Sequence, residues 1–326
     1  MKKHMYPAGL AMAALAAVLA AALLPVLSCS TEAALQRLFG ADASAPVFLG
    51  CRVPAEGEAV FDFSRPVQVS SLYLDPPMET EVLAEGNSVT VRFASSLPGG
   101  SRVTADLLVE DKDRNTLAAL VAFRTRNSRV PGLVINEIKT EYNKPKVEFV
   151  ELRVLEDGNL GALRLFAAGG KEEPVFEFPP VEVKKGAYVV VHGRSVEEGL
   201  KDETGSSTSE SRGAEASAAR DFWIPGSVKT LHKTDAVYVM DQDNRIIDGV
   251  LLDGGAAWKP SMTAAAEEMT RQGAWSGGAA ASGASTATRT MCRSAGADSN
   301  SARDWYVTVT SGATPGKANN PARYAK

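Results

Sequence analysis

The stretch LVINEI at residues 133–138, followed by EFVEL at residues 148–152, decides the fold of this chain. Each stretch is a short apolar run with polar residues inside it, a pattern typical of a mostly buried β-strand. Further strands are predicted at residues 185–191, 235–240 and 245–252. Residues 131–320 are therefore expected to form a domain built of strands.

Residues 46–128 carry a second set of strand signals. Apolar and polar residues alternate most cleanly at residues 88–93 and again at 102–109, as on strands with one buried face. Turn signals such as Pro76-Pro77 separate these runs. Short strands at this spacing predict a small β-sandwich, and the whole chain is then expected to be all-β.

Composition argues against several classes of protein. The 326 residues carry a formal net charge of −4, which is not the basic balance of a general nucleic-acid binder. An apolar content of 44% is enough to build a core. His4 lies in the amino-terminal signal, so only His192 and His232 remain and a zinc site made of several histidines is not expected. Both histidines are expected at the surface or at caps.

The amino terminus resembles a bacterial lipoprotein signal. Two lysines precede an apolar run at residues 8–27, and Ser28 and Cys29 follow it. A basic start, an apolar middle and a small residue before the cut site are typical of a secretory signal. By resemblance to the lipobox, residues 1–28 are the signal peptide and Cys29 receives the lipid. Residues 29–45 are then a tether.

The lipid anchor predicts a location in the cell envelope. The residue after Cys29 is Ser30 rather than Asp, which favours the outer membrane, on its periplasmic or its surface face. An ordinary transmembrane anchor is the alternative, because an apolar run of about 20 residues is long enough to span a bilayer.

Residues 46–128 resemble the bacterial Ig-like domains of surface-layer and envelope proteins. Residues 61–67 match an opening strand followed by an S-x-P-V pattern, and residues 97–101 resemble the L-x-P-G-T turn. Residues 111–115 resemble the closing D-x-x-G-N hairpin, with Arg114 in place of Gly. The resemblance implies a role in spacing or display.

Residues 131–320 contain five sequence blocks in order: V-I-N-E-I, E-F-V-E-L, G-x-Y-x-V-V, D-x-V-x-V and a closing D-W with T-P-G-x-x-N. Together these blocks resemble the lamin-tail domain, an Ig-like β-sandwich that also occurs in exported bacterial proteins. Arg153-Val154 departs from the family pattern. The resemblance implies two Ig-like sandwiches in tandem. It also supports structural roles for Asn136, Glu137, Glu148, Glu151, Asp248, Asp304 and Trp305.

Two low-complexity insertions lengthen this domain. Residues 203–219 are rich in Ser, Glu and Ala, and residues 263–288 are rich in Ala, Gly and Ser. Both are poor in core residues, so both are predicted to be mobile surface loops that project from one end. Trp258 precedes the second insertion and Trp275 lies inside it, which makes both candidates for contact with a ligand.

The carboxylates and the cysteines leave alternatives open. Carboxylates serve as general acids, general bases or metal ligands, so a metal-dependent hydrolase that uses Glu137, Glu148 and Asp248 is the alternative to a structural role. Cys51 and Cys292 form either a disulfide that clamps the two domains together or two separate buried thiols.

These observations predict a non-enzymatic envelope lipoprotein for scaffolding, adhesion or binding, without cofactor, metal or nucleic acid. Its expected partners are the membrane, through the lipid, and an envelope protein or a glycan. A carbohydrate- or peptidoglycan-binding lipoprotein is the alternative, in which aromatic side chains stack on sugars.

Overall fold

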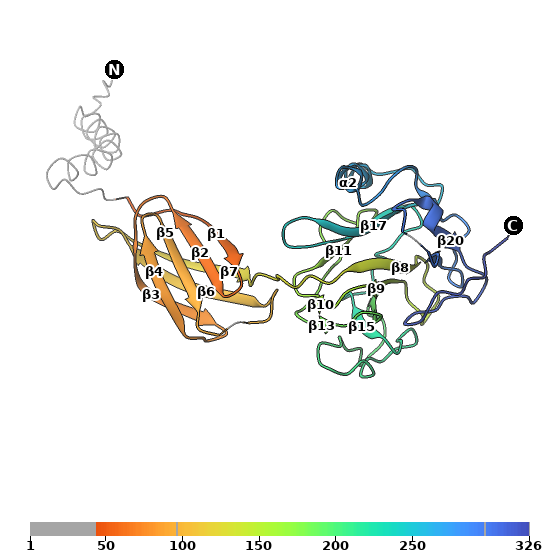
Figure 1. The fold of residues 1–326 in the computed structure, drawn as a ribbon, viewed down its shortest axis with the longest axis horizontal. Coiled ribbons are helices and arrows are strands. Elements are labelled where there is room, and N and C mark those ends of the chain that lie inside the picture. The colour runs from red at the N-terminus through yellow and green to blue at the C-terminus, as the bar shows by residue number, and fades with distance from the viewer. Residues whose placement is uncertain (1–43, 96, 297, 326) are drawn as a thin grey trace, which may run out of the picture. The chain divides into compact units, whose positions relative to one another are not determined.

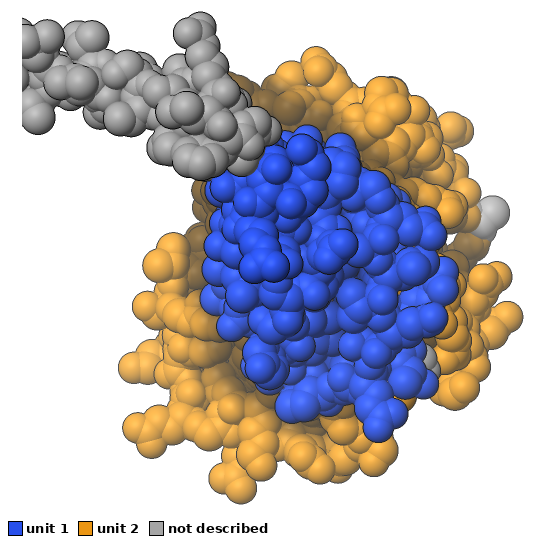
Figure 2. Space-filling model, turned by 90° about the vertical axis from the view of Figure 1, so that its left-hand side faces the viewer, with its two compact units in different colours: residues 1–52, 59–94, 104–122 blue, residues 53–58, 95–103, 123–326 orange. Residues whose placement is uncertain are grey.

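The computed structural model describes residues 44–325, except residues 96 and 297. Ser28, Cys29 and the predicted signal peptide lie outside the described residues. The chain divides into two compact units, which Figure 2 draws in different colours. Unit 1 takes the described residues up to Arg52, with residues 59–94 and 104–122. Unit 2 takes residues 53–58, 95–103 and the described residues from Phe123 onward.

Strands dominate both units, so the all-β prediction is confirmed (Figure 1). In unit 1, one sheet has the order β1-β2-β5-β4 and the other has the order β3-β6-β7. Along β6, Ala105, Leu107 and Val109 are fully buried, as expected where one face of a strand lies on a core. The strands are β1 (Phe48–Ala55), β2 (Glu58–Phe63), β3 (Gln68–Asp75), β4 (Thr80–Glu85), β5 (Ser88–Phe93), β6 (Arg102–Glu110) and β7 (Thr116–Arg124).

Unit 2 contains a six-stranded sheet with the order β15-β14-β9-β8-β19-β20 and a five-stranded sheet with the order β12-β11-β16-β17-β18. Strands β10 and β13 pair separately. The elements are β8 (Leu133–Lys139), β9 (Phe149–Val154), β10 (Gly158–Asn159), β11 (Arg164–Ala167), β12 (Phe176–Glu177), β13 (Glu182–Val183), β14 (Tyr188–His192), β15 (Arg220–Trp223), β16 (Asp235–Met240), β17 (Ile246–Asp253), helix α2 (Pro260–Arg271), β18 (Ala280–Ala281), β19 (Met291–Arg293), the short 3-10 helix η1 (Ala302–Asp304) and β20 (Trp305–Val307).

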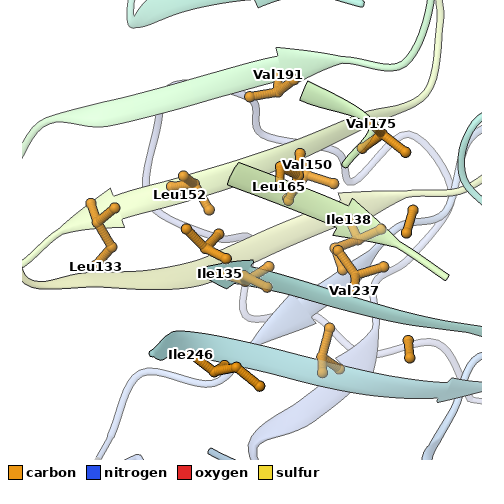
Figure 3. Packing of buried hydrophobic residues seen from close by; sticks show 14 of the residues in the cluster. Leu133, Ile135, Ile138, Val150, Leu152, Leu165, Val175, Val191, Val237 and Ile246 are labelled. Atoms are coloured by element: carbon orange, nitrogen blue, oxygen red, sulfur yellow. The ribbon is translucent and has the colours of Figure 1, made fainter. Parts of the chain in front are cut away.

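The two sheets of unit 2 pack around one apolar core. Ile135, Val150 and Leu152 reach it from the six-stranded sheet, and Leu165 and Val237 reach it from the five-stranded sheet (Figure 3). All five side chains are essentially fully buried. The sheets therefore form a sandwich, because each contributes its apolar face to the same interior.

A β-bulge in β8 determines which residues face that core. Ile135 pairs with Leu152 and Glu137 pairs with Glu151, so Asn136 is an extra residue on its strand. A bulge of this kind shifts the alternation of side chains by one position. Ile135 and Ile138 consequently both face the core, while Glu137 lies on the opposite, outer face of the six-stranded sheet.

The prediction of a projecting loop at residues 263–288 is wrong. Most of helix α2 lies in this stretch, and its buried residues are Met262, Ala265 and Met269, at helical spacing. Trp275, which follows the helix, is only 1% exposed and belongs to the core. Methionines and one tryptophan therefore attach an Ala-rich segment to the sandwich. Among the described residues, no helix is both long and apolar enough to cross a membrane.

The prediction is also wrong for residues 203–219, because this stretch folds back over the sheet. Glu203 is 2% exposed, and its Oε1 accepts hydrogen bonds from the amides of Glu210 and Ser211. Its Oε2 accepts a hydrogen bond from the amide of Asp221 in β15. The Glu203 carboxylate thus anchors this stretch through hydrogen bonds, a role that buried apolar side chains usually have.

We predict that Met269→Ala destabilises the protein by about 2–5 kcal/mol, because it leaves a cavity beneath helix α2. Chemical denaturation checks the free energy of unfolding. Glu267→Ala on the exposed side of the same helix is the control and is expected to change it by less than about 0.5 kcal/mol. Equal effects of the two substitutions would contradict a packed helix.

Candidate functional site

The outer face of the six-stranded sheet holds Glu137 and Glu151, two of the polar residues that the sequence patterns singled out. Two segments cover this face. We call residues 199–219 the covering loop and residues 311–321 the closing segment. Gly316 of the closing segment has φ +78°, and a Cβ added to it would come within 2.9 Å of Ser217 in the covering loop. The two segments therefore meet so closely that this position requires glycine.

Glu137 holds the closing segment against the sheet. Its Oε1 accepts a hydrogen bond of 2.6 Å from Thr290 Oγ1, and its Oε2 accepts one of 2.9 Å from Thr314 Oγ1. The Thr314 amide also donates to this carboxylate. Glu137 is fully buried, and burial raises its pKa. Thr290 immediately precedes β19, and Thr314 lies in the closing segment. Glu137 therefore joins two parts of unit 2.

Glu151 lies opposite Glu137 on β9 and makes a parallel set of contacts. Its Oε1 accepts a hydrogen bond of 2.6 Å from Asn136 Nδ2, and its Oε2 accepts one from the Gly316 amide. Asn319 Nδ2 in turn donates to the carbonyl oxygen of Asn136 at 2.9 Å. The bulge residue, the two carboxylates and the T-P-G-x-x-N motif thus form one network.

Burial raises the pKa of both carboxyl groups. Burial, together with the neighbouring Glu137, raises the pKa of Glu151 to about 8. Glu137 receives donors from two hydroxyl groups and a backbone amide, a set that favours an ionised carboxylate. The pKa of about 8 places a proton on Glu151 at neutral pH.

Asp248 and Trp305 are brought together through Arg293. Arg293 Nη2 lies 2.6 Å from Asp248 Oδ2, and the guanidinium lies 5.0 Å from the centre of the Trp305 ring. Asp248 also accepts a hydrogen bond of 2.6 Å from the amide of Ile135. Burial raises the pKa of Asp248 to about 6, although Arg293 opposes this shift.

Asp304 and Glu148 have partners of their own. Asp304 accepts hydrogen bonds from the Ser299 amide and hydroxyl, and it completes a capping box at η1 with Ser301. Glu148 is fully buried and forms a bidentate ion pair with Arg194.

The three carboxylates of the hydrolase hypothesis, Glu137, Glu148 and Asp248, are therefore held by different partners. Glu137 accepts from threonines, while Glu148 and Asp248 each pair with a different arginine. Within the described ranges, no group of three His, Cys, Asp or Glu residues is arranged to hold a metal ion.

His192 contradicts the expectation of a surface or capping residue. It is fully buried, its Nε2 lies 2.9 Å from Asp221 Oδ1, and its ring stacks on Trp223 at 3.8 Å. Asp221 also accepts hydrogen bonds from the amide and the hydroxyl of Ser217. The histidine thus helps to fix the covering loop, because the carboxylate it contacts also holds Ser217.

Lys139 and Glu215 form a buried ion pair between β8 and the covering loop. Lys139 Nζ lies 3.1 Å from Glu215 Oε1, and the two residues are 1% and 5% exposed. Burial lowers the pKa of Lys139, and the positive charge of nearby Lys146 lowers it further. Glu215 Oε2 is buried and has no hydrogen-bond partner among the described residues.

This pair lies in a cleft of about 460 Å³, which we call the Lys139 cleft. Lys139 at the end of β8 lines it together with four segments: the hairpin after β8, the covering loop, residues 287–288 and the closing segment. The cleft is the candidate functional site, because it combines a concave surface with incompletely paired buried charges. Its lining residues are Lys139, Asn143, Lys144, Pro145, Lys146, Ala214, Glu215, Ala216, Ala287, Thr288, Ser311, Ala313 and Pro315.

The aromatic and cysteine candidates do not contribute to this cleft. Trp275 is buried, so its predicted contact with a ligand is wrong. Trp258 is partly exposed and lines an open hollow of about 510 Å³ beside helix α2. Of the two alternatives for Cys51 and Cys292, the structure has free thiols, with Cys51 half-buried and Cys292 buried. Cys292 is fully buried on β19 opposite Glu137, where the closing segment covers it.

Sequence reasoning missed Lys139, Glu215 and Arg293. Lys139 ends an apolar strand and Glu215 lies in a low-complexity stretch, so neither stands out from its neighbours in the sequence. Arg293 follows Cys292 without any motif. Only the register of β8 and the path of the covering loop bring Lys139 and Glu215 together.

The raised pKa of Glu151 predicts a pH dependence of stability. An acid whose pKa rises from 4.5 unfolded to about 8 folded holds its proton more tightly in the folded chain. Its stabilising contribution is therefore complete below pH 4.5 and is lost as the pH rises through about 8. We expect the free energy of unfolding to fall between about pH 6 and about pH 9, and to fall less in Glu151→Gln.

Urea denaturation of the full chain at about pH 6 and about pH 9 measures this difference in the free energy of unfolding. Glu156→Gln, at an exposed position on the following turn, is the matched control and is expected to keep the wild-type slope. Parallel profiles for wild type and Glu151→Gln would show that Glu151 does not titrate in this range.

Known proteins resemble this chain to different extents. A curated relative from Treponema pallidum (strain Nichols), described as an uncharacterized protein, is 30% identical over 202 residues. The match covers 57% of this chain and 50% of the relative, so the chain spans about half the length of the curated protein it matches.

Two crystal structures of L,D-transpeptidase 3 from Mycobacterium tuberculosis also match in part. One was determined at 1.32 Å resolution and the other in complex with a faropenem-derived adduct. Both are 13% identical and cover 44% of this chain, with 81% and 80% of their own lengths. Their TM-scores are 0.17 and 0.16, which are too low to bear on the fold or the activity of this chain.

A family model matches most of unit 2. It is TP_1001_2nd, described as protein second domain, and it covers residues 131–307, which is more than half of the 326-residue chain. The matched range begins just before β8 and ends with β20, so it includes both sheets of the sandwich. This chain belongs to the TP_1001 second-domain family.

Proposed function

We propose that this protein is a non-enzymatic envelope lipoprotein whose β-sandwiches serve binding or scaffolding at a membrane. The observation that carries the proposal is the engagement of the motif carboxylates. Both oxygens of Glu137 and of Glu151 accept hydrogen bonds within the sandwich. These bonds would have to break before either carboxylate could act on a substrate, which favours a structural role.

Strand order supports an Ig-like assignment for unit 1. Its sheets β1-β2-β5-β4 and β3-β6-β7 follow the ABED and CFG arrangement of constant-type Ig domains. For unit 2 we propose a lamin-tail sandwich. This assignment is supported by the network through which Asn136, Glu137 and Glu151 hold the T-P-G-x-x-N motif. Modules of these two kinds fit display and binding.

The lipid anchor is the part of the proposal that determines location. We predict that Cys29→Ser abolishes incorporation of a fatty-acid label and moves the protein out of the membrane fraction. A lipid of several acyl chains holds a protein at the bilayer because each buried CH₂ contributes about 0.8 kcal/mol. Cys51→Ser is the control and is expected to keep the label. Unchanged labelling of Cys29→Ser would remove the lipoprotein assignment.

The binding role is tested by in-cell crosslinking, followed by purification of the tagged full-length protein. We expect one dominant envelope protein to be recovered in wild type and lost when that partner is deleted. Recovery of glycan or cell-wall material instead would favour the carbohydrate-binding alternative. The partly exposed Trp258 is the residue that supports that alternative, and glycans would then change its fluorescence. Recovery of neither would contradict a binding role.

A further inference from the structure

We infer that the Lys139 cleft binds an acidic peptide segment of a partner protein. The inference rests on the proposed binding role and names the chemistry of its partner. The cleft is lined by Lys139, Lys144, Lys146 and a single acidic residue, Glu215. Its charge is therefore positive, although the chain as a whole has a net charge of −4.

Two of these lysines are presented by a short hairpin. Backbone hydrogen bonds of 3.0 and 2.8 Å join Asn143 and Lys146, and they hold Lys144 at the turn between them. Lys144 and Lys146 are exposed, and neither forms an ion pair with any residue that the structure describes. Two exposed, unpaired cations at the rim of a cleft attract carboxylates, and they do so most strongly at low ionic strength.

Glu215, the acidic residue that lines the cleft, is incompletely paired. Glu215 Oε1 is paired with Lys139, but its buried Oε2 has no partner within the described chain. A buried acceptor without a partner is destabilising. An acidic peptide supplies carboxylates for the lysines at the rim.

The walls favour a peptide over a sugar. They consist of small side chains, including Ala214, Ala287 and Ala313, with hydroxyl groups from Thr288 and Ser311. The described lining includes no aromatic side chain on which a sugar ring could stack. The volume of about 460 Å³ lies in the usual range of ligand sites, roughly 300–1,000 Å³.

Fluorescence anisotropy of a labelled peptide of alternating Glu and Ala tests the inference on the full-length protein. We expect saturable binding that weakens about tenfold in Lys144→Ala/Lys146→Ala, because two ion pairs of roughly 0.7 kcal/mol each are lost. Lys184→Ala/Lys185→Ala removes two exposed lysines elsewhere in unit 2 and is expected to keep binding within about twofold. A peptide with Gln in place of Glu is expected to bind at least tenfold more weakly.

Two outcomes would overturn the inference: no saturable binding of the peptide, or equal losses of binding in the two double variants. These outcomes are distinguishable from failure of the proposed function. A crosslinked partner that is still captured by Lys144→Ala/Lys146→Ala would retain the binding role and place it on another surface. Peptide binding in vitro without any captured partner in cells would retain the inference about the cleft and contradict the proposed binding role.

Discussion

The bulge at Asn136 is the constraint on which the rest of unit 2 depends. A regular β8 would alternate its side chains without interruption, so Ile135 and Ile138 could not both face the core. The extra residue lets both isoleucines reach the interior and turns Glu137 to the outer face, opposite Glu151. One local irregularity therefore builds the apolar core and the polar network at the same time.

A buried polar face is stable only if its groups find partners. Burying a carboxylate without hydrogen bonds is costly, and two carboxylates side by side are costlier still. The closing segment meets this requirement with the amides and hydroxyl of Thr314 and Gly316, and Asn319 bonds back to the bulge. The closing segment supplies hydrogen-bond donors to the buried carboxylates of the sheet. The segment has few apolar residues of its own, so it is ordered by these contacts with the sheet. Each is therefore ordered by the other.

Periodicity was sufficient to predict the strands but not what covers them. The alternation at residues 102–109 and the apolar run at 133–138 predicted β6 and β8, because a strand buries its side chains in a local pattern. The two insertions were misjudged because composition counts apolar residues and ignores their spacing. Met262 and Met269 form a helical stripe in an Ala-rich stretch, and Glu203 organises a loop through three backbone amides.

The Lys139 cleft follows from the same arrangement. Lys139 is two residues beyond Glu137, so the bulge that turns Glu137 outward also places Lys139 on the outer face. The closing segment that Glu137 and Glu151 hold in place supplies Ser311, Ala313 and Pro315 to the wall of the cleft. The covering loop supplies Glu215 from the other side and is itself fixed where Ser217 contacts Asp221. The motif carboxylates therefore shape the Lys139 cleft without lining it, which explains why motifs can be recognised in the sequence while the residues of the cleft cannot.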